Sequence, residues 1–265
     1  MNRISLTVAA LILAVTLGAA AQDGRPPVSW VNPDLPDGPN LSHHVLASTA
    51  LGHDVGYALY LPPEYDEQPD RAFPVIVFLH GMGGDESKDA AGFSGAVASA
   101  VREGTLPPSI VLFPNGGRSG YRGEVEAMIV GELIPLVDRE YRTRGADGRV
   151  AAGFSMGGAG VVRLAIAHPE LFRRVASWGG GMRGDAAEGV RANADALRER
   201  GVAFLTINGD EDRPDAFDSL AEVADAEGLS HEHVVLPDTG HNLGKYYSDS
   251  APRMMAFLGE ALKNE

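Results

Sequence analysis

The six residues Gly153-Phe154-Ser155-Met156-Gly157-Gly158 decide how the rest of the chain is interpreted. They follow the apolar run of residues 149–152, which is typical of a strand, and precede a helical pattern over residues 159–167. A G-x-S-x-G sequence between a strand and a helix predicts a nucleophile elbow, a sharp turn that exposes the serine side chain. Glycines on either side of the serine leave room for such a turn. Because short patterns of this kind also occur by chance, the prediction requires partners for Ser155 elsewhere in the chain.

The composition is that of an ordinary globular protein. The chain has 265 residues, of which 44% are hydrophobic, and it contains 33 glycines. This is enough apolar material to bury a full core. Short apolar runs alternate with helical patterns, which favours the α/β class, with a mostly parallel central sheet and helices on both faces.

The first residues have the three parts of a secretory signal peptide. Met1-Asn2-Arg3 is positively charged, residues 4–18 are almost entirely apolar, and Ala19-Ala20-Ala21 supplies small residues. We expect cleavage after Ala21 and export to a periplasm or to the extracellular space, because the apolar run is short for a membrane-spanning helix. Residues 22–42 are rich in proline and are expected to form an extended or wrapping arm. Residues 43–265 are expected to form a single domain.

The charge and the absence of cysteine exclude several classes of function. A formal charge of −14 argues against nucleic acids and anionic membrane surfaces as partners. Without cysteine the chain has no disulfides and no thiolate chemistry. The sequence leaves the oligomeric state open.

Several apolar runs predict strands. Residues 44–48 and 55–61 lie on either side of a turn signal and predict an antiparallel hairpin. Continuous apolar runs are expected for strands that are buried on both faces of a sheet. Such runs occur at residues 73–79, 109–114 and 202–207, and residues 233–237 are predicted to form the last strand. A helical pattern from Val125 to Tyr141 contains Pro135, which is expected to kink or split that helix.

The loop after residues 73–79 is His80-Gly81-Met82-Gly83-Gly84-Asp85. In enzymes with a nucleophile elbow, this loop supplies one backbone N–H of the oxyanion hole, and the residue after the nucleophile supplies the other. We therefore expect the amides of Met82 and Met156 to form the oxyanion hole, and His80 to be packed rather than catalytic. A phosphate-binding loop is disfavoured because the lysine of a P-loop is missing.

A neutral serine needs a base, and the base needs an acid to orient it. The buried run of residues 202–207 is followed by Asn208-Gly209-Asp210-Glu211-Asp212, and both aspartates are candidates for the acid, with Asp212 favoured. The acidic cluster could instead be a solvated turn or a weak cation site. His241 follows the last predicted strand and is the candidate base. The pair His231 and His233 has a spacing that can bind metal but is more typical of an exposed edge strand.

Three residues near the carboxyl ends of the predicted strands are candidates for lining the substrate cleft, where open α/β sheets bind ligands. They are Arg118, Tyr121 and Trp178. No metal and no organic cofactor is implied by these residues.

With these residues identified, the chain resembles the putative-esterase family of α/β-hydrolases, which includes esterase D-like enzymes and feruloyl and acetylxylan esterases. The resemblance extends from about His43 to the C-terminus. It is carried by residues 55–65, 73–85, 114–117, 132–143 and 152–158. It implies an α/β-hydrolase fold in which Ser155 is the nucleophile, Asp212 the acid and His241 the base. Two departures are a short segment between Trp178 and Val202, which implies no large lid, and the polar Arg213 directly after the acid.

The function that this resemblance implies is an exported serine esterase that hydrolyses small-molecule or glycan-linked carboxylic esters through an acyl-enzyme. Acyl transfer to an alcohol would use the same three residues. A serine peptidase is less favoured because the usual cap or propeller is missing. A non-catalytic binding protein with this fold is expected to lack one of the three residues, and all three are present.

Overall fold

The computed structural model describes residues 26–35, 38, 40–182 and 186–263. The predicted signal peptide, residues 1–21, lies outside the described residues, as do residues 22–25 of the proline-rich arm. None of the helices within the described residues is long and apolar enough to cross a membrane.

Eight strands form one sheet in the order β1-β2-β4-β3-β5-β6-β7-β8. The strands are β1 (Leu41–Ser48), β2 (His53–Tyr60), β3 (Val75–Leu79), β4 (Ile110–Pro114), β5 (Arg149–Phe154), β6 (Arg174–Trp178), β7 (Ala203–Gly209) and β8 (Ser230–Leu236). The first two form an antiparallel hairpin, β2 is also antiparallel to β4, and all the other pairs are parallel. The predicted sheet and its N-terminal hairpin are therefore confirmed.

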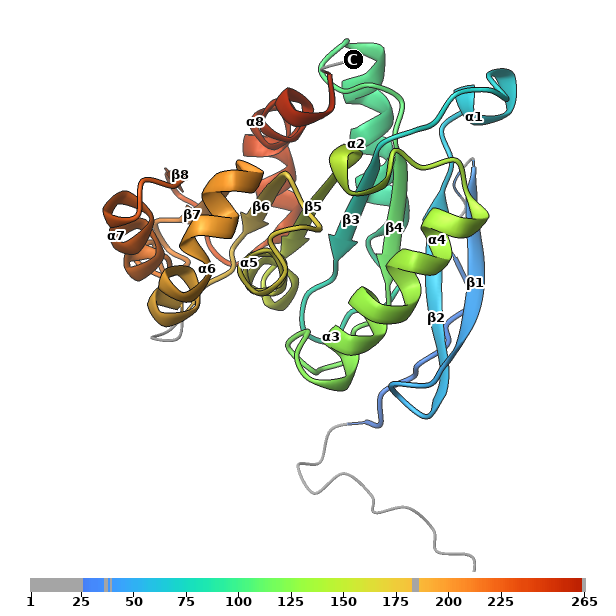
Figure 1. The fold of residues 1–265 in the computed structure, drawn as a ribbon, viewed down its shortest axis with the longest axis horizontal. Helices are drawn as coiled ribbons and strands as arrows, with labels where there is room; N and C mark the ends of the chain where they lie inside the picture. The colour runs from blue at the N-terminus through green and yellow to red at the C-terminus, as the bar shows by residue number, and fades with distance from the viewer. Residues whose placement is uncertain (1–25, 36–37, 39, 183–185, 264–265) are drawn as a thin grey trace, which may run out of the picture.

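Helices cover both faces of the sheet (Figure 1). They are α1 (Glu64–Glu67), α2 (Ala90–Arg102), α3 (Glu124–Met128), α4 (Ile134–Glu140), α5 (Met156–Ala167), α6 (Ala186–Arg200), α7 (Asp218–Ala226) and α8 (Leu243–Leu262), with a short 3-10 helix at Gly145–Gly148. The apolar side chains of α2 and α8 belong to the core cluster on one face. Those of α3, α4, α5, α6 and α7 belong to the cluster on the other face.

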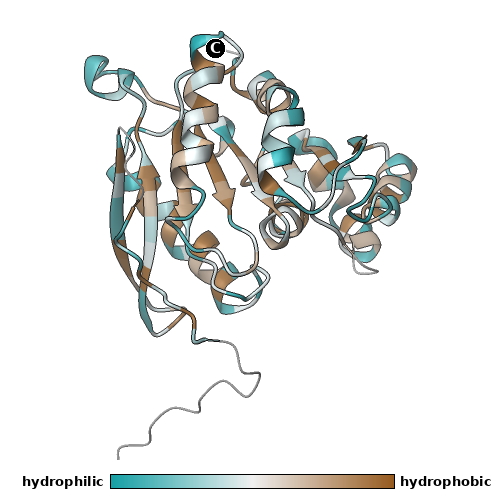
Figure 2. Ribbon diagram, turned by 180° about the vertical axis from the view of Figure 1, so that it is seen from behind, coloured by the Kyte–Doolittle hydropathy of each residue, from teal (hydrophilic) through white to brown (hydrophobic). Residues whose placement is uncertain are grey.

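The strand β3 shows why its sequence is apolar throughout. Val75, Val77 and Leu79 belong to one core cluster, whereas Ile76 and Phe78 belong to the other. Side chains alternate across a strand, so a strand covered by helices on both faces must be apolar at every position. Figure 2 shows these central strands in brown, between helices with more hydrophilic outer sides.

The helical segment that contains Pro135 is divided in three. A π-helix at Ile129–Leu133 separates α3 from α4, and Pro135 lies at the start of α4. Proline has no N–H to donate to the preceding turn, so the hydrogen-bond pattern changes before it. The split expected from the sequence is confirmed.

The described part of the N-terminal arm lies against the domain. The Gly56 amide donates to the Trp30 carbonyl over 2.6 Å, and the Trp30 ring lies 4.9 Å from the His53 ring. The buried Glu86 carboxylate accepts hydrogen bonds from the Asn32 backbone and side-chain amides over 2.6 and 2.9 Å. These contacts hold the arm beside the loop that follows β3.

The two histidines of β8 lie on the last strand of the sheet. His231 Nε2 and His233 Nδ1 lie 3.0 and 2.8 Å from the hydroxyl oxygen of Thr206. Within the described residues no group of three or more His, Asp or Glu side chains is arranged to hold a metal ion. Burial, followed by the neighbouring His233, lowers the pKa of His231 from 6.5 to about 4.

This pKa predicts how stability depends on pH. Because the unfolded chain binds the proton more tightly, the free energy of unfolding should decrease as the pH falls from 6.5 towards 4, the window between the two pKa values. The variant His231→Gln removes the proton-binding site and should show a weaker decrease over this range. Urea titrations at several pH values measure the difference, and identical pH profiles for the two proteins would contradict the prediction.

Candidate active site

Ser155 lies at the turn between β5 and α5. Its backbone has φ 55° and ψ −114°, a region that costs most residues on the order of 1–3 kcal/mol. Its amide donates to the Trp178 carbonyl over 2.8 Å, and its carbonyl accepts from the Ala159 amide over 3.0 Å. These two hydrogen bonds hold the strained turn and leave the serine side chain at the carboxyl edge of the sheet. This is the geometry expected of a nucleophile elbow.

Gly157 makes this turn possible. A β-carbon added at Gly157 would lie 1.9 Å from the carbonyl oxygen of Leu79, which is far inside van der Waals contact. Any other residue would push α5 away from β3 and move Ser155 with it. The glycine requirement inferred from the sequence is therefore a requirement for close approach between helix and strand.

His241 connects Ser155 to Asp212. Its Nε2 lies 2.9 Å from the Ser155 hydroxyl oxygen, and its Nδ1 lies 2.6 Å from Asp212 Oδ2. With the proton on Nδ1, His241 donates to the carboxylate and its Nε2 accepts from the serine hydroxyl. The imidazole also stacks on the Phe154 ring, with 4.8 Å between centroids and 27° between planes. The carboxylate and the stacked ring together fix the orientation of the imidazole.

The two candidate acids have different surroundings. Asp212 is buried and faces His241, as described above. Asp210 is exposed and instead accepts hydrogen bonds from the backbone amides of Asp238 and Thr239, each over 3.1 Å. These bonds, that of Thr239 foremost, lower the pKa of Asp210. Asp210 thus holds the loop that leads to His241, whereas Asp212 contacts the imidazole itself.

Tyr246 is a residue of this site that the sequence analysis missed. Its hydroxyl donates to Asp212 Oδ2 over 2.7 Å and accepts from the Gly209 amide over 2.8 Å. Burial, and then the hydrogen bond to Asp212, raise the pKa of Tyr246, so the phenol stays protonated as a donor. The sequence feature that could have identified Tyr246 is its position near the start of α8, only five residues after the candidate base His241.

Replacing Tyr246 by phenylalanine tests this role as a positioning residue. We expect kcat to fall by about tenfold, because Asp212 loses a donor and becomes free to turn away from His241. The variant also leaves the buried Gly209 amide without its acceptor, which should lower the free energy of unfolding by about 1–3 kcal/mol. Steady-state kinetics and urea unfolding measure the two effects. A loss of stability with no change in kcat would show that Tyr246 supports only the fold.

The loop that follows β3 lies beside Ser155 because of the sheet register. Leu79 pairs with Gly153, so residues 80–82 run alongside residues 154–156. A β-carbon added at Gly81 would lie 3.4 Å from the β-carbon of Ser155. The backbone amides of Met82 and Met156 make no hydrogen bond to a side chain within the described residues. They also make none to a backbone carbonyl in the turns and loops of that part of the chain. Both amides are therefore available to a ligand at the serine.

His80 holds this loop in place. Its Nδ1 donates to the Gly81 carbonyl over 2.8 Å, its Nε2 accepts from the Gly116 amide over 2.9 Å, and its carbonyl accepts from the Tyr121 hydroxyl over 3.0 Å. Burial lowers the pKa of His80, so the ring is neutral and can accept at Nε2. His80 is packed, as expected.

Two of the three predicted cleft residues do not line a cleft. Tyr121 and Trp178 are fully buried. The Tyr121 hydroxyl donates to the His80 carbonyl beneath the loop, and the Trp178 indole donates to the Ser250 hydroxyl over 2.9 Å. Arg118 is close to the surface, but its guanidinium donates to the Pro26 carbonyl over 2.7 Å and so holds the N-terminal arm. The prediction was wrong for Tyr121 and Trp178 because their backbones turn the rings into the core.

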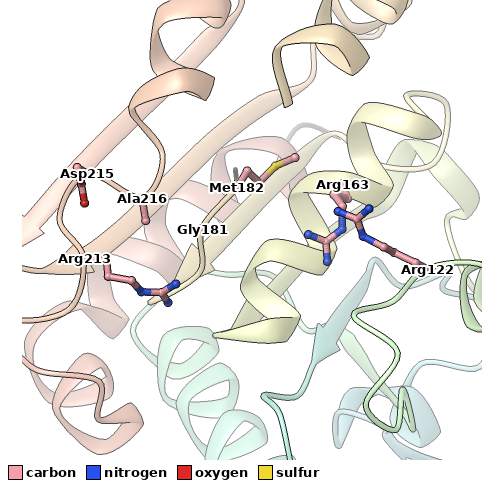
Figure 3. A pocket seen from close by; sticks show the side chains of 7 residues that line it. All are labelled: Arg122, Arg163, Gly181, Met182, Arg213, Asp215 and Ala216. Carbon is pink, nitrogen blue, oxygen red and sulfur yellow. The ribbon is translucent and has the colours of Figure 1, made fainter. Parts of the chain in front are cut away.

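A pocket of about 590 Å³ lies beside the residue that follows Asp212. It is lined by the segment after β6 and the segment after Asp212, with Arg213 on one side and Arg122 and Arg163 on the other (Figure 3). Arg122 and Arg163 are not identifiable from the sequence, because neither lies in a recognisable motif.

Comparisons with known proteins agree on one family. The family described as "Putative esterase" matches residues 48–247. The chain is 30% identical over 154 residues to Esterase MT1326 of Mycobacterium tuberculosis, covering 54% of this chain and 32% of that protein. It is 26% identical to a probable feruloyl esterase C of Aspergillus niger, covering 74% of this chain and 72% of that protein. The chain thus spans about a third of the length of the mycobacterial relative.

Solved structures show the same fold. The structure of a ferulic acid esterase matches with a TM-score of 0.71 at 20% identity, covering 84% of this chain and 98% of that chain.

Proposed function

This chain belongs to the putative esterase family, and we propose that it is an exported serine esterase that hydrolyses carboxylic esters through Ser155, His241 and Asp212. The observation that carries the proposal is the unbroken series of hydrogen bonds from the serine hydroxyl through the imidazole to the carboxylate, 2.9 and 2.6 Å long. This arrangement is the one by which a neutral hydroxyl becomes a nucleophile.

The first half of the reaction forms the acyl-enzyme. Ser155 Oγ attacks the ester carbonyl while His241 Nε2 accepts the hydroxyl proton, and Asp212 stabilises the resulting imidazolium. The negative charge that develops on the carbonyl oxygen is stabilised by the amides of Met82 and Met156, and each such donor contributes roughly 3 kcal/mol to lowering the barrier. When the tetrahedral intermediate breaks down, His241 gives its proton to the departing alcohol.

The second half releases the acid. Water attacks the acyl carbon, His241 accepts a proton from it, and the Ser155 oxygen leaves and recovers its proton from the imidazolium. The His241 side chain is 43% exposed, so water reaches the base directly. Transfer to a second alcohol would need that alcohol to outcompete this water for the acyl-enzyme.

The substrate proposal takes its starting point from the relatives. One relative is named as a probable feruloyl esterase, and one structural neighbour is a feruloyl esterase module in complex with sinapinate. Hydroxycinnamate esters are therefore the first natural esters to test, beside simple acetate esters. Export by the N-terminal 21 residues is part of the proposal, because esters attached to polymers are found outside the cell.

Turnover of 4-nitrophenyl acetate and of methyl ferulate tests the proposed function. We expect both esters to be hydrolysed, with kcat/KM in the range of 10⁴ M⁻¹s⁻¹ or above for the preferred one, roughly the lower limit for natural enzyme–substrate pairs. If water is the normal acceptor, adding methanol to the reaction with 4-nitrophenyl acetate should yield little methyl acetate relative to acetic acid. A protein that hydrolyses no ester across a range of acyl lengths would overturn the proposal.

A further inference from the structure

The pocket beside Asp212 has an unusual charge for this molecule. Three guanidinium groups line it, those of Arg122, Arg163 and Arg213, together with one carboxylate, that of Asp215. The chain as a whole carries a formal charge of −14 and repels anions at long range. Three arginines in one pocket of an otherwise acidic protein favour binding of an anionic ligand at that pocket.

The pocket adjoins the reacting groups. Gly181, which lines it, lies two residues after Gly179, and a β-carbon added at Gly179 would lie 2.9 Å from Asp212 Oδ2 and 3.3 Å from His241 Nδ1. Arg213 directly follows Asp212, and its guanidinium donates to the Gly179 carbonyl over 3.3 Å. Gly179 and Arg213 thus link the walls of the pocket directly to the residues that contact Asp212 and His241.

Arg213 adopts a backbone conformation that does not suit it. Its φ is 48°, in the left-handed region that is strained for a residue with a side chain. Such strain is retained where the position of a side chain has a use. The left-handed turn brings the guanidinium to the edge of the pocket, where the side chain is 54% exposed (Figure 3).

Arg163 sets the distance from the serine. Its backbone lies on α5 seven residues after Met156, about 10 Å farther along the helix axis at 1.5 Å per residue, and its guanidinium donates to the Gly120 carbonyl. Figure 3 shows Arg122 and Arg163 across the pocket from Arg213, with Gly181 and Met182 between them. A group bound among these side chains is thus separated from the ester carbonyl by several bonds.

We propose that this pocket binds a carboxylate at the far end of the substrate, so that the preferred esters are half-esters of dicarboxylic acids or esters of hydroxy acids. The inference rests on the proposed esterase function and adds the substrate class. Guanidinium groups match the planar geometry of a carboxylate with two parallel hydrogen bonds. The volume of about 590 Å³ accommodates a chain of several carbons together with this end group.

The experiment compares each charged ester with its neutral partner. The substrates are 4-nitrophenyl half-esters of succinic, adipic and suberic acid, each beside the same ester with its free carboxylate capped as a methyl ester. Acetate esters of ω-hydroxy acids, free and methyl-capped, place the charge on the alcohol side. The measured quantity is the ratio of kcat/KM for the charged ester to that for the capped ester.

For the wild type we expect a ratio of about ten or more at one chain length, because a charge-assisted hydrogen bond contributes about 1.5–3 kcal/mol. The ratio should increase with length until the carboxylate reaches about 10 Å and should fall as salt is added. The variants Arg122→Gln and Arg163→Gln should each lower it at least about fivefold. Arg139→Gln, an exposed arginine on α4 that pairs with Glu140, is the matched control and should leave the ratio unchanged.

Two results would overturn the proposal. One is that kcat/KM for the charged ester never exceeds that for the capped ester, at any chain length and with the carboxylate on either the acyl or the alcohol side. The overall negative charge of the protein alone would produce this result. The other is a high ratio that persists in both pocket variants. Arg122 is exposed, so Arg122→Gln is expected to fold even if Arg163→Gln does not. Since hydrolysis of the capped esters depends only on the esterase function, loss of that activity identifies failure of the function itself rather than of the pocket.

Discussion

Replacing Ser155 by alanine is expected to reduce kcat for ester hydrolysis by about 10⁴- to 10⁶-fold. The alanine removes the only atom through which an acyl group could be attached at the elbow, and the oxyanion-hole amides and the imidazole cannot replace it. The change removes one oxygen from a half-buried position, so the melting temperature should change by no more than a few degrees. Release of 4-nitrophenol from 4-nitrophenyl acetate, with circular dichroism as the folding check, measures both quantities.

Ser248→Ala is the matched control for this experiment. Ser248 is exposed on α8, and its hydroxyl contacts the Lys245 carbonyl rather than any group of the site. The control variant should retain full activity. An Ser155→Ala protein that folds and keeps more than about a tenth of the wild-type kcat would contradict the assignment of the nucleophile.

Replacing Asp212 by asparagine is expected to lower kcat by about 10³- to 10⁴-fold. The amide is close to isosteric with the carboxylate, but its NH₂ group donates to His241 Nδ1 and so moves the ring proton to Nε2. The imidazole then presents an N–H to Ser155 and cannot accept the hydroxyl proton. Rates measured at saturating ester should show the loss in kcat rather than in KM.

Asp210→Asn separates the two candidate acids. Asp210 accepts hydrogen bonds from the amides of Asp238 and Thr239, so its loss should loosen the loop before His241 and reduce kcat by less than about tenfold. A larger effect at Asp210 than at Asp212 would reverse the assignment of their roles.

The elbow and the order of the three residues could be predicted from the sequence because each has a local signal. Ser155 lies in a glycine-bounded motif, Asp212 follows an apolar run that forms the buried strand β7, and His241 follows the run that forms the last strand, β8. Parallel strands bring their carboxyl ends to one edge of the sheet, so local signals at three strand ends imply one site. The beginning of α5 was predicted three residues late, at residue 159 instead of Met156, because glycines were interpreted as part of the turn.

The choice between Asp210 and Asp212 had no local signal. Both follow β7 within three residues, and the difference arises from Tyr246, which approaches from α8, 34 residues after Asp212. Tyr246 itself was missed for the same reason. Its role depends on the packing of α8 beside the loop after β7, which brings Tyr246 to Asp212. The spacing of residues in the sequence does not reveal such a contact.

The two incorrect cleft residues show a second limit. Aromatic residues near strand ends often line ligand sites, but their direction depends on the backbone. Tyr121 has φ 58°, and its ring lies so close to α5 that a β-carbon added at Gly160 would be 2.6 Å from it. The arginines that do line a pocket come from three separate segments, and the fold alone brings them together.

The central claim is that the Ser155 hydroxyl is made nucleophilic by His241. Its most direct test is to treat the protein with diisopropyl fluorophosphate and to locate the adduct by peptide mass spectrometry. We predict one adduct, on Ser155, formed at a rate at least about 10³-fold lower in His241→Ala. An adduct on a different serine, or labelling of Ser155 at the same rate without the imidazole, would contradict the account.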